Sequence, residues 1–350
     1  MKKTAEGNFF EDFAVGRTLV HGIPRTVTTG DAALYLGLTG ARHAVHCADS
    51  FARACGHPRA PIDDLLTFHV VFGKSVPDVS LNAVANLGYA EGRFLAPVYA
   101  GDTLHARSEV VGLKENSNGR TGTVYVRTTG LRGDEPVLAY VRWVMVRKRD
   151  PASPTPEPQV PQLKAALDVD DLVVPPHLRA PDDPEGVAGA RWRLEDYEVG
   201  ERIDHVDGMT IEEAEHRIAT RLYQNTARVH FDQHREQHGR FGKCIVYGGH
   251  VLSLARALAW SGLETVVAIV GINGGTHANP CFAGDTIYAW SEVLDRKPLP
   301  GRDDLGALRL RLVAAKDHPC HDFPLKGEDG RYRGEVLLDF DYWALMPRRR

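Results

Sequence analysis

The chain has 350 residues, 43% of them hydrophobic and 25% charged, a composition typical of globular proteins and a length that allows two domains. Its 46 acidic and 42 basic side chains are interspersed and give a net charge of −4, so no basic face indicates a nucleic-acid or membrane partner. The five cysteines lack CxxC spacing and no segment reaches the roughly 18 apolar residues of a membrane helix, so we expect a soluble, cytoplasmic protein.

An opening segment near the N-terminus recurs in the second half of the chain. FEDFAVGRTL at 10–19 matches LEDYEVGERI at 194–203, an offset of 194 − 10 = 184 residues. LAPVYAGDTLHARSEVV at 95–111 matches ANPCFAGDTIYAWSEVL at 278–294, an offset of 183 residues. The two halves therefore look like copies of one domain.

We place the first copy at residues 1–150 and the second copy at residues 191–350. PASPTPEPQVPQ at 151–162 carries five prolines and predicts a linker that runs over 151–190. Within this linker, QLKAALDVDDL predicts a short helix.

Alternating apolar residues predict a strand that begins at the Ala-Gly-Asp-Thr turn of each copy. The predicted inward positions are Leu104, Ala106, Ser108 and Val110 in the first copy, and Ile287, Ala289, Ser291 and Val293 in the second. A helical period follows Gly249, where Val251, Leu254, Ala255 and Leu258 share one face. Each copy is therefore expected to be an α+β unit, an antiparallel sheet packed on a helix.

The stretch YQNTARVHFDQH in the second copy places Asn225 five residues before His230. Histidine suits proton transfer near neutral pH, because its unperturbed pKa lies near 6.5. Asn225 suits either the capping of a helix or the holding of a water molecule. The simplest alternative is that His230 lies on a solvated helix face.

A glycine pair, Gly248 and Gly249, stands directly before the predicted helix of the second copy. A glycine at a helix start offers an unpaired backbone N–H with the positive end of the helix dipole behind it. Such a donor can polarise a thioester carbonyl and stabilise the enolate that forms from it. The alternative is an ordinary N-terminal turn.

With Asn225, His230 and Gly249 in this order, the sequence resembles the MaoC-like, R-specific enoyl-CoA hydratases. That family has an acidic residue, or in some members asparagine, five residues before a histidine, with a His-Gly pair downstream. The tandem copies fit its double hotdog fold, two antiparallel sheets each wrapped on a central helix, along nearly the whole chain. The resemblance implies a hydro-lyase that reversibly adds water to an enoyl-CoA thioester, with no cofactor because coenzyme A is part of the substrate.

The sequence departs from the family pattern at two positions. Asn225 cannot ionise, so we expect His230 to transfer the proton alone while Asn225 orients the water, and Gly248 stands where the family usually has histidine. The first copy has Ala41, Asp64 and Leu65 at the positions of Asn225, Gly248 and Gly249. We therefore expect one active site per chain, with the first copy shaping the acyl pocket.

The members that the whole chain most resembles act on a branched dicarboxyl chain, which implies a free carboxylate on the substrate. Arg42, His43 and His46 occupy the matching place in the first copy and are candidates to bind it. Their alternative role is that of surface residues left by duplication. Arg240 and Lys243, just before the glycine pair, are candidates for binding the coenzyme A phosphates, although most such side chains are simply solvated.

Other functional classes have weaker support. His230, His234 and His238 recur every four residues, but on one helix the first and third would lie roughly 12 Å apart, so we expect no metal site. The chain has neither a GxSxG elbow nor a GxGxxG loop after a strand. A hotdog acyl-CoA thioesterase and a non-catalytic acyl-CoA binding protein remain as alternatives, and a homodimer is compatible with two fused copies.

Overall fold

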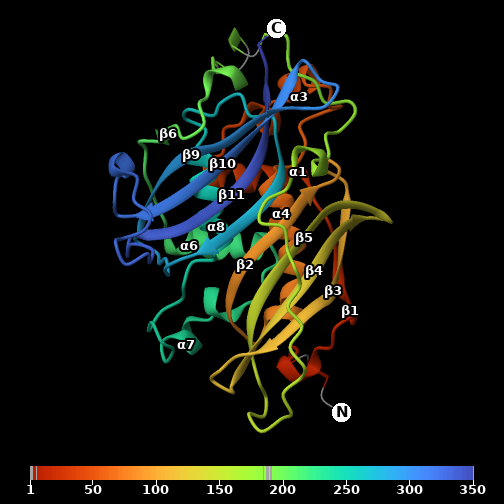
Figure 1. Ribbon diagram of the computed structural model, residues 1–350, viewed down its shortest axis with the longest axis vertical. Coiled ribbons are helices and arrows are strands. Elements are labelled where there is room, and N and C mark those ends of the chain that lie inside the picture. The colour runs from red at the N-terminus through yellow and green to blue at the C-terminus, as the bar shows by residue number, and fades with distance from the viewer. Residues whose placement is uncertain (1–2, 5, 184, 187–188, 190, 350) are drawn as a thin grey trace.

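The computed structural model describes residues 3–4, 6–183, 185–186, 189 and 191–349, and its main feature is one continuous antiparallel sheet (Figure 1). Within the described residues this sheet has eleven strands, in the order β1-β3-β4-β5-β2-β8-β11-β10-β9-β6, with β7 paired to β9. The first five strands in this order belong to the first copy and the others to the second. Equivalent strands of the two copies therefore lie in mirrored order, as expected for two fused α+β units.

The strands of the first copy are β1 (Thr18–Thr26), β2 (Ala83–Phe94), β3 (Thr103–Glu115), β4 (Thr121–Arg132) and β5 (Glu135–Arg147). Those of the second copy are β6 (Arg202–Asp204), β7 (Met209–Thr210), β8 (Ala268–His277), β9 (Thr286–Pro298), β10 (Leu305–Lys316) and β11 (Val336–Pro347). The α-helices are α1 (Thr29–Thr39), α2 (Ala44–Cys47), α3 (Asp49–Ala54), α4 (Asp64–Ser75), α6 (Glu213–Leu222), α7 (Gln233–Glu236) and α8 (Gly248–Leu258). The remaining helical turns are η1 (Phe10–Asp12), η2 (Val76–Ser80), η3 (Val169–Asp171), η4 (Leu194–Asp196), η5 (Arg228–His230) and η6 (Cys320–Asp322). No helix in the described part of the chain is both long enough and apolar enough to cross a membrane.

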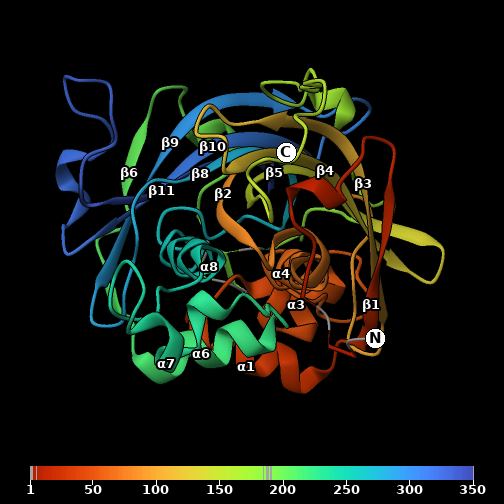
Figure 2. The same ribbon diagram turned by 90° about the horizontal axis from the view of Figure 1, so that it is seen from below.

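The sheet arches over two central helices, α4 and α8, which lie side by side beneath it (Figure 2). Every residue of α4 from Leu65 to Ser75 is buried, as is every residue of α8 from Gly249 to Leu258. The apolar face predicted for the second helix thus belongs to a helix that is buried on all sides. Helices α1 and α6 pack on each other and on α8, on the side that faces away from the sheet (Figure 2).

An approximate two-fold axis relates the two copies and passes between the central helices. His69 Nε2 of α4 lies 2.8 Å from Ser253 Oγ of α8, and these residues are 184 positions apart, so equivalent positions touch each other. The sheet is joined across the same axis by β2 and β8, where Gly92 pairs with Ile272. Residues separated by the sequence offset are therefore related by the approximate two-fold axis of the fold.

The inward positions predicted for β3 and β9 are confirmed. All eight side chains are buried: Leu104, Ala106, Ser108, Val110, Ile287, Ala289, Ser291 and Val293. The serine of each strand is buried because it has a histidine partner from its own copy. His21 Nε2 lies 2.7 Å from Ser108 Oγ, and His205 Nε2 lies 2.8 Å from Ser291 Oγ.

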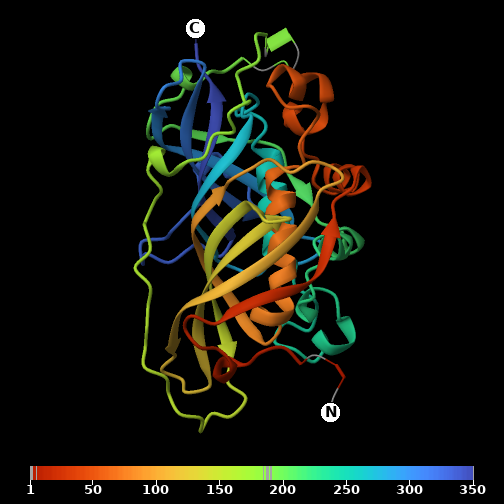
Figure 3. The ribbon, with the colours of Figure 1, turned by 90° about the vertical axis from the view of Figure 1, so that its right-hand side faces the viewer.

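Residues 148–183, which follow β5, cross the outer face of the sheet, opposite the helices (Figure 3). In this segment, the N–H of Leu167 donates to Asn273 Oδ1 of β8 at 2.8 Å, and Trp343 Nε1 of β11 donates to the Leu167 carbonyl at 3.1 Å. The short helix predicted in QLKAALDVDDL forms only as the three-residue 3-10 helix η3, since side chains of the sheet take the backbone hydrogen bonds of Leu167. Positions 184, 187, 188 and 190 of the predicted linker lie outside the described residues.

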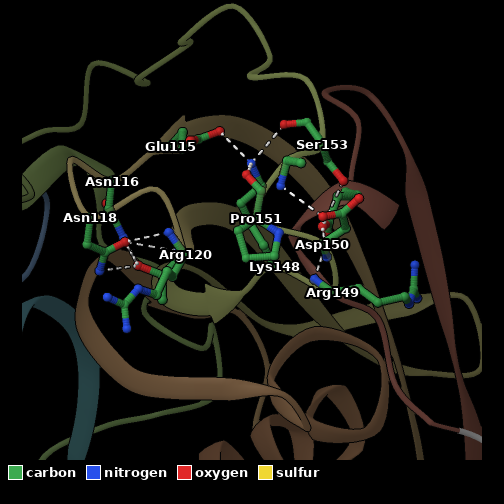
Figure 4. Close-up of polar contacts among 12 residues, drawn as sticks. Glu115, Asn116, Asn118, Arg120, Lys148, Arg149, Asp150, Pro151 and Ser153 are labelled. Carbon is green, nitrogen blue, oxygen red and sulfur yellow. Dashed lines mark hydrogen bonds and ion pairs between the residues drawn. The ribbon is translucent and has the colours of Figure 1, made fainter.

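Lys148 fixes the point at which this segment leaves the first copy (Figure 4). Its buried ammonium group donates to Glu115 Oε2 at 3.1 Å and to the carbonyl oxygens of Pro151 and Ser153 at 3.2 and 2.9 Å. A buried ammonium ion needs such partners because burial without them is costly. The first residues after β5 are therefore tied to the end of β3.

Helix α4 carries a glycine where a loop of the second copy crosses it. A Cβ atom on Gly73 would lie 1.9 Å from the carbonyl oxygen of Tyr223, so only glycine permits this approach. The next residue in the loop, Gln224, has a positive φ of 53°, and Asn225 follows it. The first copy thus sets the position of the loop that carries Asn225.

We expect Gly73→Ala to lower the melting temperature, with a loss of about 1–3 kcal/mol in the free energy of unfolding, because the added methyl group meets backbone rather than a movable side chain. Gly37→Ala on α1 is the matched control, since a Cβ there meets nothing within 4 Å. Alanine in that helix should be neutral or stabilising by up to about 1 kcal/mol. Differential scanning calorimetry compares the two, and equal melting temperatures would contradict the proposed steric role of Gly73.

Candidate active site

The loop after α6 presents Asn225 to the interior. Its side chain is buried, and its N–H donates to the Thr220 carbonyl at 3.0 Å. Its Oδ1 accepts the N–H of Ala227 at 2.9 Å, which identifies the oxygen end of the amide. Asn225 Nδ2 has no hydrogen-bond partner among the described residues, so two N–H donors are available to a bound molecule.

His230 lies at the end of η5 and is 9% exposed. Its Nδ1 lies 3.0 Å from the carbonyl oxygen of Ile245, so Nδ1 carries the proton in the neutral ring. Burial lowers the pKa of His230 to about 4, although the Ile245 carbonyl favours the protonated form. At pH 7 the imidazole is therefore neutral, and its Nε2, which has no partner in the described part of the chain, is a free base.

Helix α8 begins beside this imidazole at Gly248 and Gly249. Among the described residues, neither glycine N–H has an acceptor, as is usual for the first turn of a helix. A Cβ on Gly249 would lie 2.4 Å from the ring of Tyr247, and a Cβ on Gly248 would lie 2.4 Å from His277 Nδ1. The Tyr247 ring also meets His230 edge to face, with 5.5 Å between the centroids. Only glycines allow the helix start to approach these rings.

Aromatic side chains of the first copy form the opposite wall. The ring of Phe72 on α4 lies 5.7 Å from that of Tyr247, and His69 lies 5.6 Å from it. Tyr89 of β2 places its hydroxyl 3.1 Å from His277 Nε2. The helix start and the imidazole of the second copy therefore face side chains of the first copy.

The equivalent place in the first copy cannot offer the same donors. Asp63, which corresponds to Tyr247, accepts the N–H of Leu65 at 2.8 Å, so the position of Gly249 is capped there. Asp64 replaces Gly248 and accepts the N–H of Ile269 at 2.7 Å. His46 keeps the arrangement of His230, with Nδ1 3.2 Å from the Pro61 carbonyl, but its Nε2 lies 3.8 Å from Asp64. The first copy has an imidazole without an open helix start.

The structure does not bring Arg42, His43 and His46 to the His230 site. Arg42 stacks on Trp260 with its Cζ 4.4 Å from the ring centroid. His43 is buried and hydrogen-bonds Arg256. Symmetry explains this placement: because these residues match the motif of the second copy, they surround the equivalent place in their own copy.

Arg240 and Lys243 lie in the exposed segment between α7 and α8. The Arg240 guanidinium lies 5.0 Å from the ring centroid of Phe241, and Lys243 Nζ lies 4.4 Å from that of Phe282. The rings of Phe241 and Phe282 meet edge to face at 5.5 Å. Two residues beyond Lys243, Ile245 supplies the carbonyl that holds His230, so this basic and aromatic surface adjoins the site.

The three histidines spaced four residues apart do not share one helix. His230 is buried at the end of η5, whereas His234 and His238 are exposed in and just after the separate helix α7. Among the described residues, no group of three or more His, Cys, Asp or Glu side chains is arranged to hold a metal ion.

Sequence reasoning missed the residues that surround the motif in space. Tyr247 stands directly before the glycine pair, and its position there is the one local signal that could have identified it. Phe72, Tyr89 and His277 carry no such signal, because each comes from an element far from the motif in the chain.

Two fused hotdog units, with an open helix start beside a neutral imidazole in one of them, define a double-hotdog protein of the MaoC-like class. A crystal structure of a MaoC domain protein dehydratase from Chloroflexus aurantiacus superimposes with a TM-score of 0.98 at 59% identity, covering 100% of both chains. A Mycobacterium tuberculosis protein with a double hotdog fold gives a TM-score of 0.74 at 25% identity, covering 97% of this chain and 98% of that one.

Residues 1–324 match the family model of mesaconyl-CoA hydratase, and the chain belongs to this family. It is 60% identical over 348 residues to the β-methylmalyl-CoA dehydratase of Chloroflexus aurantiacus, with 99% of each chain covered. It is 59% identical over 349 residues to the mesaconyl-CoA hydratase of Cereibacter sphaeroides, with 99% of this chain and 100% of the other covered. The predicted membership of a hydro-lyase family is confirmed.

Burial predicts a marked loss of stability in mild acid. The buried histidines whose pKa burial lowers are His43, His57, His69, His205, His216, His230, His250 and His277. Below pH 6.5 the unfolded chain protonates these rings while the folded chain does not, so the free energy of unfolding falls as the pH falls. Each ring contributes up to about 1.4 kcal/mol per pH unit until its folded pKa is reached.

Urea unfolding between pH 7.5 and 5.0 measures this loss. We expect the midpoint concentration to fall steeply below pH 6.5. Asp64, whose pKa burial raises to about 6, acts in the opposite direction but is one group against several. A midpoint that stayed constant over this range would mean that the histidines are protonated in the folded protein.

Proposed function

We propose that the protein reversibly hydrates mesaconyl-CoA to β-methylmalyl-CoA at the second-copy site. The observation that carries this proposal is the unpartnered N–H of Gly249 beside the unpartnered Nε2 of a neutral His230. One group can hold a thioester oxygen while the other takes a proton from water. The names of two relatives, 60% and 59% identical to this chain, describe the two directions of this reaction.

The reaction assigns one role to each group. The Gly249 N–H, at the positive end of α8, donates to the thioester oxygen and stabilises the enolate. Asn225 Nδ2 donates to the oxygen of the attacking water, and that water gives its proton to His230 Nε2. The hydroxide bonds to the β-carbon as the double bond opens, and His230 then returns the proton to the α-carbon, so one water is added in total.

Coenzyme A is proposed to extend from this site over the basic and aromatic surface of Arg240 and Lys243. Two cations suit its phosphates, and the exposed ring of Phe241 suits the flat adenine. The protein needs no further cofactor in this scheme. The prediction of a cytoplasmic location is retained on its cysteine content, and a homodimer remains compatible with the fold.

We expect purified protein to remove the enoyl-thioester absorbance of mesaconyl-CoA without releasing free thiol. His230→Ala should lower kcat by a factor of roughly 10²–10⁴, since general base catalysis is worth about that much. His46→Ala changes the equivalent histidine of the first copy and separates the two copies. Activity retained in His230→Ala but lost in His46→Ala would move the site to the first copy. Thiol release would indicate a thioesterase, and binding without turnover an acyl-CoA binding protein.

Asn225→Asp tests the role of a neutral amide. A carboxylate can keep the bond from Ala227 through one oxygen, but it adds a negative charge to the site of His230. The added charge should raise the pKa of His230 by roughly one unit or more, so the acid limb of kcat/KM moves to higher pH. In the unaltered protein this limb should lie near the folded pKa of about 4. A pH–rate profile identical to that of the unaltered protein would contradict the proposed proximity of the two side chains.

A further inference from the structure

Arg142 on β5 is a fully buried arginine without a carboxylate partner among the described residues. Its relative exposure is 0%, and it forms no ion pair with any residue that the structure describes. Its firmest hydrogen bond is from Nη2 to Ser75 Oγ at 2.8 Å, and two contacts to Ser80 Oγ are longer, at 3.4 Å. Its Nε has no hydrogen-bond partner among the described residues. An arginine stays protonated in proteins, so the interior holds an unneutralised positive charge.

Two chains of contacts lead from Arg142 to the candidate active site. Its Cζ lies 4.2 Å from the ring centroid of Phe72, and that ring contacts Tyr247, which meets His230. Tyr89 is the cross-strand neighbour of Arg142, and its hydroxyl meets His277, which lies beside Gly248. The guanidinium thus stands behind the aromatic wall that faces the helix start.

Tyr247 adds a donor on the same side. Its buried hydroxyl has no hydrogen-bond partner in the described part of the chain. Burial raises the pKa of Tyr247 well above its usual range, and the charge of Arg142 opposes this rise. The phenol is therefore protonated and free to donate. A cation and a hydroxyl donor, both buried and both incompletely satisfied, are chemically suited to an anionic ligand.

The first-copy counterpart also holds a buried arginine, and there a carboxylate interacts with it. Arg256 on α8 is also buried, at the position equivalent to Phe72. Its positive charge acts to lower the pKa of Asp64, the carboxylate at the start of α4. At the His230 site Gly248 replaces that carboxylate. The charge of Arg142 is left for a ligand to neutralise.

We propose that Arg142 binds the free carboxylate of the acyl group and is the residue that selects dicarboxyl over monocarboxyl enoyl-CoA substrates. This inference rests on the proposed function, because it assumes that the thioester carbonyl accepts a hydrogen bond from the Gly249 N–H. In mesaconyl-CoA the carboxylate is attached to the β-carbon, so it must lie on the far side of the reacting double bond from that N–H. Phe72 and Tyr89 connect Arg142 with the His230 site, whereas Arg42 stacks on Trp260.

Arg142→Met and Arg142→Lys test the assignment, with mesaconyl-CoA and crotonyl-CoA as substrates. We expect Arg142→Met to lower kcat/KM for mesaconyl-CoA about 100-fold or more and to change that for crotonyl-CoA less than about 3-fold. Arg142→Lys keeps the charge but loses the planar fork, so its loss on mesaconyl-CoA should be intermediate. The melting temperature of free Arg142→Met should be unchanged or higher, because an unpaired buried charge is removed.

Arg256→Met is the matched control, since it removes a buried arginine at the other place and should leave the ratio of the two substrates unchanged. If Arg142 is merely structural, Arg142→Met will melt lower and lose both activities together, which overturns the inference. If Arg142→Met does not fold, Arg142→Lys decides, because an unaltered substrate ratio in it also overturns the inference. An unaltered protein that hydrates crotonyl-CoA but not mesaconyl-CoA would instead overturn the proposed function.

Discussion

The close approach of α4 and α8 is the contact on which the rest of the structure depends. His69 Nε2 and Ser253 Oγ meet at 2.8 Å on the approximate two-fold axis, and a Cβ on Gly249 would lie 2.6 Å from His69. Because the helices are this close, the N-terminal end of one copy's helix is faced by the side chains of the other copy. A single hotdog unit would leave that helix start without an opposite wall. The second copy therefore needs the first one even though the motif lies in the second alone.

The two copies keep the same backbone and differ in where they place charge. At the start of α4, Asp63 accepts the N–H of Leu65 and Asp64 accepts the N–H of Ile269 in β8. At the start of α8, the N–H groups of Gly248 and Gly249 have no acceptor among the described residues. The buried cation of one place is on a helix, in Arg256, and that of the other is on a strand, in Arg142. A helix start whose N–H groups are hydrogen-bonded by side chains is stable, but it has no donor left for a ligand. A helix start with unpaired N–H groups is less stable but can bind an oxyanion. The duplication therefore assigns stability to one copy and ligand binding to the other.

The sequence predicts those features that depend on local pattern. Strands β3 and β9 follow from alternation at Leu104 and Ile287, and the start of α8 follows from its glycines. The repeat itself predicts the double unit. The short helix predicted in QLKAALDVDDL is limited to the three residues of η3, because the backbone of Leu167 bonds to Asn273 and Trp343, which are remote in the chain. Local helix propensity takes no account of such hydrogen bonds to residues remote in the chain.

The opposite wall of the site is unpredictable for a related reason. The offset of 184 residues relates each position of the second-copy motif to its equivalent in the first copy. Arg42 is one of these equivalent positions. It therefore lies at the first-copy place, not across from His230. Residues that lie across from a motif, such as Phe72 and Arg142, match nothing near it in either copy. Only the pairing of β2 with β8 and the packing of the two helices identify them.

The substrate carboxylate that Arg142 is proposed to bind also affects His230, the proposed base. A buried imidazole with a pKa near 4 resists protonation, which keeps it free to accept but makes it a weak acceptor. A substrate carboxylate entering the same low-dielectric interior favours the imidazolium, since a nearby negative charge raises the pKa of a histidine. A substrate without the carboxylate leaves the imidazole as weak a base as it is in the free protein. The same group that Arg142 would recognise thus makes His230 a stronger base when water must lose its proton, so selection and catalysis draw on one electrostatic interaction.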